Sequence, residues 1–237
     1  MKIKYSVFVP VYNESKILEK NISLIYKEMK RFKSPFEIII VDDNSNDQTQ
    51  AIGKHLEKKQ KQIRYVRFAS GPSRRENLAK AMKMARGGIL VYIDIDLAVN
   101  PKYLKNLIMD SYNWDIVIGS RYLKGSRVKR TFFRRFISNM YNNFMRFWLG
   151  SNIKDHQCGF KAFKKSVVFP IISEMGYDKK LTRGWFWDAE LLIRAQRKGH
   201  SIKEIPVEWV RGNKSSFNIR RELRMVPYVI KLRGKLK

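Results

Sequence analysis

The first half of the chain alternates short apolar runs with longer amphipathic stretches. The apolar runs, rich in Val and Ile, have the length of buried strands and span Tyr5–Val11, Glu37–Val41, Ile63–Phe68, Ile89–Ile93 and Ile116–Gly119. The stretches between them show helical spacing and span Glu14–Phe32, Thr49–Lys59, Glu76–Ala85 and Pro101–Tyr112. Buried strands that alternate with helices predict an α/β fold with a mostly parallel central sheet and right-handed crossovers. Such sheets bind ligands where the carboxyl ends of their strands meet.

Two carboxylates follow the fourth predicted strand, one residue apart, as Asp94 and Asp96. Hard oxygen ligands at this spacing suit Mg²⁺ or Mn²⁺, and such an ion in turn binds a diphosphate. Alternatively, one acid binds the ion while the other holds a ribose, or both are solvated loop acids. The glycine-rich fingerprints of dinucleotide-binding folds and P-loops are absent from the sequence.

Asp42 and Asp43 end the second predicted strand. Their carboxylates can accept hydrogen bonds from a nucleobase N–H or from ribose hydroxyls. Helix capping is the structural alternative, but Asp47 is better placed for it because the next helical stretch begins at Thr49. We therefore expect Asp42 and Asp43 to bind a ligand and Asp47 to cap a helix.

Positive charge is concentrated after Gly119. The chain has 237 residues and a formal net charge of +28, which predicts a polyanionic partner: nucleic acid, an anionic membrane surface or a phosphorylated substrate. Residues 121–150 contain eight Lys or Arg, eight aromatic residues and no acid, and residues 211–237 contain nine Lys or Arg and one acid. The stretch 131–149 predicts a basic amphipathic helix. Such a helix lies at a membrane interface, packs on the sheet, or does both.

Cysteine content and hydropathy exclude other classes. The single cysteine, Cys158, excludes a disulfide framework and a multi-cysteine zinc site, and we expect it to be a small buried residue. No apolar run approaches the roughly 18 residues that span a bilayer, and the N-terminus enters a strand without a signal-peptide pattern. We expect a cytoplasmic protein attached peripherally to the cytoplasmic face of a membrane, since each basic residue near an anionic surface contributes about 1 kcal/mol.

Three segments at predicted strand ends, Val9–Glu14, Val41–Thr49 and Asp94–Asp96, together resemble the family 2 glycosyltransferases, which have the GT-A fold. Four later segments are similar to the dolichyl-phosphate glucosyltransferase and dolichyl-phosphate mannose synthase branch: Gly119–Tyr122, Asp155–Lys161, Trp187–Leu191 and Gly212–Ser215. The resemblance implies a glycosyltransferase domain over residues 1–217, with a nucleotide-sugar half 1–120 and an acceptor half 121–217. A basic amphipathic segment, 218–237, follows it.

The resemblance also implies roles for matching residues. The nucleotide sugar would be bound by Pro10, Tyr12, Glu14, Val41, Asp42, Asp43, Asp94, Ile95, Arg211 and Lys214. The catalytic candidates are Asp96, Arg121, Asp155 and Asp188; the metal would be held by Asp94 and Asp96, and the acceptor phosphate by Arg121, Arg127 and Arg130. Two positions depart from the family pattern. Ala98 stands where mannose synthases have a glutamine metal ligand, and the Gly71–Glu76 stretch lacks the usual Gly-Lys-Gly loop.

The activity implied is inverting, metal-dependent transfer of a hexose to a polyprenyl (dolichyl) phosphate. UDP-glucose is the first donor expected and GDP-mannose the second, with UDP-N-acetylglucosamine open. A phosphate acceptor is largely dianionic at neutral pH and needs no general base. The alternative acceptor is a sugar hydroxyl, in glycan or lipid-linked oligosaccharide extension, with Asp188 as the base. Asp188 also fits a helix N-terminus beside core tryptophans.

Nucleic-acid binding is a third hypothesis, which the charge fits and the strand-end acids oppose. Those acids would repel a nucleic acid, and we expect no nucleic-acid partner.

Overall fold

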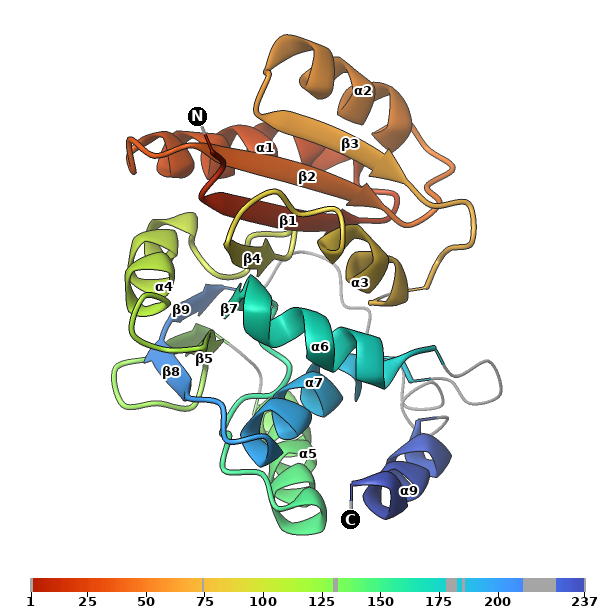
Figure 1. Ribbon diagram of the computed structural model, residues 1–237, viewed down its shortest axis with the longest axis vertical. Coiled ribbons are helices and arrows are strands. Elements are labelled where there is room, and N and C mark those ends of the chain that lie inside the picture. Colours follow the sequence, from red (N-terminus) through yellow and green to blue (C-terminus); the bar gives the residue numbers. More distant parts are fainter. Residues whose placement is uncertain are drawn as a thin grey trace.

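The computed structural model describes residues 2–73, 75–129, 132–177, 183–184, 186–210 and 225–236. Within these residues a seven-stranded sheet has the strand order β3-β2-β1-β4-β7-β5-β8 (Figure 1). Its strands are β1 (Tyr5–Val11), β2 (Phe36–Asp42), β3 (Ile63–Arg67), β4 (Ile89–Ile93), β5 (Ile116–Ser120), β7 (Phe160–Lys164) and β8 (Ile202–Pro206). All pairings are parallel except those of β7 with β4 and β5. The mostly parallel sheet confirms the predicted fold class. A separate parallel pair joins β6 (Arg127–Lys129) to β9 (Glu208–Val210).

Helices cover both faces of the sheet. They are α1 (Ser15–Lys30), α2 (Thr49–Lys59), α3 (Glu76–Met82), the 3₁₀ turn η1 (Pro101–Tyr103), α4 (Leu104–Asp110), α5 (Phe132–Leu149), α6 (Lys165–Met175), α7 (Phe186–Arg197) and α9 (Val226–Lys235). One core lies between the sheet and the buried residues of α1 and α4, and a second lies between the opposite face and α3, α6 and α7. Because both faces are covered, the central strands are apolar at nearly every position.

The predicted elements of the first half are present with small shifts at their ends. β1, β4 and α2 have the predicted bounds, β3 and β5 differ by one residue at one end, and β2 is one residue longer at each end. The predicted helix over 101–112 is instead a 3₁₀ turn followed by α4, which ends at Asp110. Asn100 starts this turn by accepting a hydrogen bond from the backbone N–H of Lys102 at 3.0 Å.

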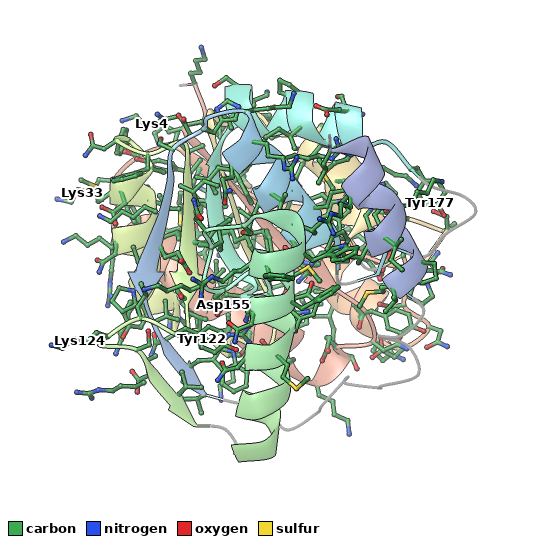
Figure 2. The ribbon with its side chains drawn as sticks, turned by 90° about the horizontal axis from the view of Figure 1, so that it is seen from below. Lys4, Lys33, Tyr122, Lys124, Asp155 and Tyr177 are labelled. Carbon is green, nitrogen blue, oxygen red and sulfur yellow. The ribbon has the colours of Figure 1, made fainter. Side chains whose placement is uncertain are left out.

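Helix α7 lies between the sheet and an outer layer formed by α5 and α9 (Figures 1 and 2). Trp187 and Leu191 face the sheet core, whereas Phe186 and Ile193 belong to a third apolar cluster with α5 and α9. Tyr228, Val229 and Leu232 are the α9 residues of that cluster. The amphipathic C-terminal helix is therefore packed on the domain through its apolar side.

A buried carboxylate on α7 also bonds to α9. Glu190 is fully buried and accepts a hydrogen bond from the Tyr228 hydroxyl at 2.7 Å. Its other partners are the guanidinium groups of Arg194, at 2.9 Å, and Arg183, at 3.2 Å. The two guanidinium groups compensate the charge of this buried carboxylate, and the Tyr228 bond fixes α9 against α7.

We expect Tyr228→Phe to lower the free energy of unfolding by about 1.5–3 kcal/mol, because the substitution removes a hydrogen bond to a buried charged group. Urea denaturation measures the change. Tyr26→Phe is the matched control, since the Tyr26 hydroxyl donates a 3.3 Å bond to the neutral amide of Gln62; its cost should be about 1 kcal/mol or less. Equal costs for the two variants would contradict the assignment.

Candidate functional site

The loops that follow β1 and β2 are bound to each other at the carboxyl edge of the sheet. The backbone N–H of Asn13 donates to Ser45 Oγ at 3.0 Å, and Asn13 Oδ1 accepts from the N–H of Asn46 at 2.8 Å. The N–H of Glu14 donates to Thr49 Oγ1 at 2.9 Å. Asn13 has φ of 55°, in the left-handed region that asparagine tolerates. The two predicted nucleotide-binding motifs thus form one surface.

Asp42 and Asp43 are both buried, and protein donors engage their carboxylates. Asp42 Oδ1 accepts from the N–H and hydroxyl of Ser45, at 2.8 and 2.6 Å, and Oδ2 accepts from the hydroxyl of Tyr65. Asp43 accepts from the N–H and hydroxyl of Ser73, at 2.7 and 2.9 Å, and from the amide of Asn77 at 2.6 Å. Contact of either carboxylate with a nucleotide stays a prediction, and in this structure both shape the loops around the site.

Asp47 caps two helices with one carboxylate, as its predicted capping role requires. Oδ1 accepts from the N–H of Thr49, the first residue of α2, at 2.9 Å. Oδ2 accepts from the N–H of Ser15, the first residue of α1, at 3.2 Å. Although partial burial alone would raise the pKa of Asp47, the hydrogen bonds from Thr49 and Ser15 outweigh it and lower the pKa to about 2.

The other predicted nucleotide-binding residues of this edge differ in exposure. The Tyr12 side chain is exposed, and Pro10 and Glu14 are half-buried beside it. Val41 and Ile95 instead belong to the two sheet cores. Any contact that Val41 or Ile95 makes with a ligand is therefore a contact of its backbone.

Asp94 and Asp96 follow β4 in a tight turn. Asp94 is 40% exposed, and the N–H of Ala98 donates to Asp96 Oδ1 at 3.1 Å. Leu97 has φ of 48°, a conformation that bulky side chains rarely adopt and that strained functional turns often contain. Desolvation and the nearby charge of Asp94 raise the pKa of Asp96. Asp96 also lines a groove of about 550 Å³ between α1 and this turn.

These two carboxylates fit a divalent cation. A cation would offset the like-charge repulsion that raises the pKa of Asp96. The described residues contain no cluster of three or more His, Cys, Asp or Glu side chains that could hold a metal by themselves. Mg²⁺ is commonly held by one or two carboxylates, with phosphate and water completing its shell. The donor set suits an ion that arrives with a diphosphate.

Asp188 is placed differently from a general base. It is 2% exposed, on the first turn of α7, and three donors engage its carboxylate. Arg75 Nε donates at 3.0 Å, Lys161 Nζ donates at 3.1 Å, and the Tyr92 hydroxyl donates as well. Although burial raises the pKa of Asp188, Lys161 and Arg75 outweigh it and lower the pKa. Burial and three protein donors are what the structural interpretation of the motif expects, and a role of Asp188 as a general base stays a prediction.

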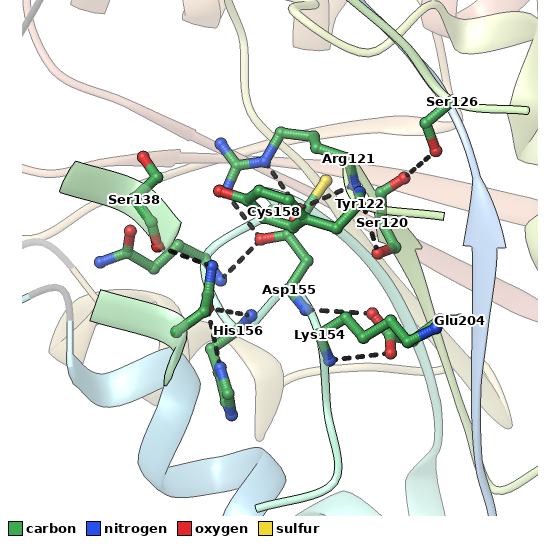
Figure 3. Close-up of polar contacts among 12 residues, drawn as sticks. Ser120, Arg121, Tyr122, Ser126, Ser138, Lys154, Asp155, His156, Cys158 and Glu204 are labelled. Atoms are coloured by element: carbon green, nitrogen blue, oxygen red, sulfur yellow. Dashed lines mark hydrogen bonds and ion pairs between the residues drawn. The ribbon is translucent and has the colours of Figure 1, made fainter. Parts of the chain in front are cut away.

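Asp155 and Arg121 form a buried, two-point ion pair (Figure 3). Arg121 Nε and Nη2 donate to the Asp155 carboxylate at 2.6 and 2.7 Å, and the Arg121 backbone N–H adds a third bond at 3.0 Å. Burial raises the pKa of Asp155, but the charge of Arg121 outweighs it and lowers the pKa. Glu204 of β8 accepts from the backbone N–H groups of Lys154 and Asp155. The pair fixes the loop before β7 to the end of β5.

Neighbouring residues of this loop are structural. His156 is buried between Asn142 of α5 and Ser151, with ring nitrogens 2.9 and 2.8 Å from their side-chain oxygens. Burial lowers the pKa of His156 to about 4, so the ring is neutral at neutral pH. Cys158 is a buried free thiol, as expected.

The remaining predicted residues are basic. Arg127 is exposed on β6. Arg130, Arg211 and Lys214 lie outside the described residues.

Sequence reasoning missed Arg75, Lys161 and Gly159. Arg75 binds Asp94 and Asp188, Lys161 is a fully buried lysine, and Gly159 lies against the Asp94 carboxylate. One signal was available, because a lysine within the apolar run Phe160–Phe163 needs a buried anion as its partner.

Comparisons with known proteins identify the family. A family model described as "Glycosyl transferase family 2" matches residues 6–169. Glycosyltransferase AglD from Haloferax volcanii is 34% identical over 211 residues, which are 87% of this chain but only 33% of AglD, so the chain spans about a third of that relative. Dolichyl-phosphate beta-glucosyltransferase ALG5A from Trichomonas vaginalis is 30% identical over 239 residues, which cover 96% of this chain and 72% of that protein.

Solved structures share the fold. Glucosyl-3-phosphoglycerate synthase from Mycobacterium tuberculosis, in complex with UDP, has a TM-score of 0.70 and 17% identity over 98% of this chain and 80% of that chain. The same enzyme with Mn²⁺ and UDP-glucose has a TM-score of 0.70 and 18% identity over 98% and 79%. This likeness confirms the predicted GT-A fold.

We expect Asp47→Ala to lower the free energy of unfolding by about 1–2 kcal/mol at neutral pH, because two helix N–H groups lose their acceptor. The folded-state pKa lies below the ordinary value, so this contribution is complete above about pH 5 and lost as the pH falls toward 2. Urea denaturation across this range should show the two proteins converging in acid. Asp47→Asn, which keeps one acceptor oxygen, should cost less, and a gap between alanine variant and parent that does not depend on pH would contradict the argument.

Proposed function

This chain belongs to glycosyl transferase family 2, and we propose that it transfers a hexose from a nucleotide sugar to a polyprenyl phosphate. The relatives called dolichyl-phosphate beta-glucosyltransferase support a dolichyl-type acceptor and a glucosyl donor. The UDP and UDP-glucose bound to the structural neighbours support UDP-glucose as the first donor, with GDP-mannose second. The sheet edge with Tyr12, Glu14 and the Asp94–Asp96 turn is the proposed donor site.

The proposal rests on a difference among the acids near the site: some are open to solvent, and others are closed off by burial and by protein donors. Asp94 is 40% exposed in its turn, whereas Asp42, Asp43, Asp155 and Asp188 are all buried and engaged by protein donors. An acceptor hydroxyl would need a base, and the candidate Asp188 is one of the closed acids, but an acceptor phosphate is ionised already, since its second pKa is about 6. A phosphate acceptor can therefore react without a general base.

In the proposed reaction, a phosphate oxygen attacks the anomeric carbon and the bond to the nucleoside diphosphate breaks. One displacement inverts the configuration, so an α-linked donor gives a β-linked product. Asp94 and Asp96 would hold Mg²⁺ or Mn²⁺, which when bound neutralises charge on the leaving diphosphate. The chain's own work is to orient the donor, to fix Arg121 through Asp155, and to attract the acceptor phosphate with Arg127 and Arg130.

A basic apolar face on α5 and α9 supports attachment to an anionic membrane surface. The exposed apolar side chains are Met140, Phe144, Phe147, Val226 and Ile230, and Phe147 is 89% exposed. Arg146, Lys231 and Arg233 are exposed beside them, and the Arg233 guanidinium lies 4.0 Å from the Trp148 ring centroid, which joins the two helices. Figure 2 shows both helices on the same side of the molecule. In the described part of the chain, no helix is both long and apolar enough to cross a bilayer.

We expect label from radioactive UDP-glucose to move into an organic-soluble product when the chain, Mn²⁺ and polyprenyl phosphate are combined. Asp96→Asn should lower this transfer by about 100-fold or more, because the ion contributes several kcal/mol of charge stabilisation. Asp110→Asn is the matched control, a surface acid on α4 paired with Lys203, and should keep parental activity.

Assays with GDP-mannose and UDP-N-acetylglucosamine under the same conditions identify the sugar. Donor binding without organic-soluble product from any donor would refute the phosphate acceptor. Label that appears instead on an added glycan would favour the hydroxyl acceptor.

We expect the chain to sediment with vesicles of phosphatidylglycerol and much less with phosphatidylcholine. Phe147→Ser and Ile230→Ser should each weaken vesicle binding by about tenfold, since each removes an apolar side chain from the lipid interface. Met109→Ser, an exposed apolar residue on α4, is the control and should bind as the parent does. Equal losses for all three variants, or none, would contradict the assigned face.

A further inference from the structure

The Asp94 carboxylate is held from two sides. Its Oδ1 accepts a hydrogen bond from Arg75 Nη2 at 3.1 Å. Its Oδ2 occupies the space that a side chain at position 159 would fill, since a Cβ built on Gly159 would lie 1.7 Å from that oxygen. The backbone N–H of Asp94 also donates to the Gly159 carbonyl at 3.0 Å. Gly159 thus provides a slot, and Arg75 keeps the carboxylate in it.

Arg75 is itself fixed. Its side chain is 5% exposed, its Nε donates to Asp188 Oδ2 at 3.0 Å, and its guanidinium carbon lies 4.9 Å from the centre of the Tyr92 ring. One planar group therefore joins the exposed acid of the turn to a buried acid of α7. Lysine cannot reproduce this geometry, because its ammonium lacks the planar fork.

The charge of Asp188 has a second partner besides Arg75. Lys161 Nζ lies 3.1 Å from Asp188 Oδ1 and 3.0 Å from the Tyr92 hydroxyl. Lys161 therefore neutralises Asp188 even when Arg75 is replaced by a neutral residue. The pairing of Asp188 therefore does not by itself account for this arginine, and its contact with Asp94 needs another explanation.

We propose that Arg75 is a positioning residue of the donor site, which holds the Asp94 carboxylate over Gly159 in the orientation that receives the cation, and that Asp188 acts through Arg75. The inference rests on the proposed function, because it assumes that Asp94 binds a divalent cation. A carboxylate ordered in advance loses less conformational freedom on binding, and loss of the partner that orients a metal ligand commonly weakens metal affinity 10–100-fold.

The direction in which metal affinity changes when Arg75 is replaced distinguishes a positioning role from a purely electrostatic one. The guanidinium is a cation beside a cation site, so as a charge alone it repels the metal, and Arg75→Gln would tighten metal binding. As a positioning group it prepares Asp94, and Arg75→Gln weakens binding. Arg75→Lys keeps the charge and loses the fork, so it weakens binding only if position matters.

The experiment titrates the purified chain with Mn²⁺ in the presence of UDP. The electron paramagnetic resonance signal measures the free Mn²⁺ at each step. We expect Arg75→Gln and Arg75→Lys each to raise the Mn²⁺ dissociation constant by about tenfold or more. Gly159→Ala should do the same, because its methyl group displaces the Asp94 carboxylate. Asp188→Asn combined with Arg75→Gln should add little to either single substitution, since both act through one contact.

Arg194→Gln is the matched control. It breaks a comparable buried ion pair with Glu190 on α7, the helix that carries Asp188. Its Mn²⁺ affinity should equal that of the parent even where its melting temperature falls.

Unchanged or tighter Mn²⁺ binding by Arg75→Gln would overturn the inference while leaving the proposed function intact. If that variant fails to fold, parental Mn²⁺ binding by both Arg75→Lys and Gly159→Ala would overturn the inference equally. A parent chain that binds no Mn²⁺ with UDP, nor with GDP in a repeat of the titration, contradicts the proposed function, and the inference falls with it.

Discussion

Charge buried inside a protein must be paired, and the two acids buried on α7 impose this requirement on everything around them. Asp188 and Glu190 are two residues apart, so their side chains leave the helix in different directions. Asp188 faces the sheet, where it binds Arg75, Lys161 and Tyr92. Unpaired, either carboxylate would cost several kcal/mol.

Glu190 faces the outer layer, where the Tyr228 hydroxyl of α9 and the guanidinium of Arg183 bind it. Arg183 in turn lies 3.5 Å from Glu76, the first residue of α3, directly after Arg75. One helix thus connects the Asp94–Asp96 turn, the start of α3 and α9. The rigidity of the site and the docking of α9 have a common physical origin.

The sequence was most informative where one local rule decides the structure. Runs such as Ile89–Ile93 are apolar enough to be buried on both faces, and the observed strand has the predicted bounds. The turn with Asp94 and Asp96 was identifiable because two acids directly follow such a strand. No strand was predicted after residue 120, and there β7 contains a buried lysine that interrupts the apolar pattern.

Long-range pairing is what the sequence could not specify. Arg75 and Asp188 are 113 residues apart, and nothing local distinguishes this arginine from the many others of a strongly basic chain. Because the sequence does not show these long-range partners, Asp188 was assigned alternative roles as a base and as a helix-end residue. An acid becomes a base only if it is open to the substrate, and exposure depends on partners that meet only in the folded chain.

Helix α5 shows why an amphipathic pattern left two interpretations open. Its apolar residues divide in the structure: Met145 and Leu149 are buried against α7 and α9, whereas Phe144 and Phe147 are exposed. A protein core and a lipid interface both select large apolar side chains, so helical spacing cannot separate them. The separation comes from neighbouring elements, because α9 covers one edge of the stripe and leaves the other uncovered. The uncovered edge, with Arg146 beside it, is the part of the pattern that packing does not explain and that the proposed attachment to an anionic surface would explain.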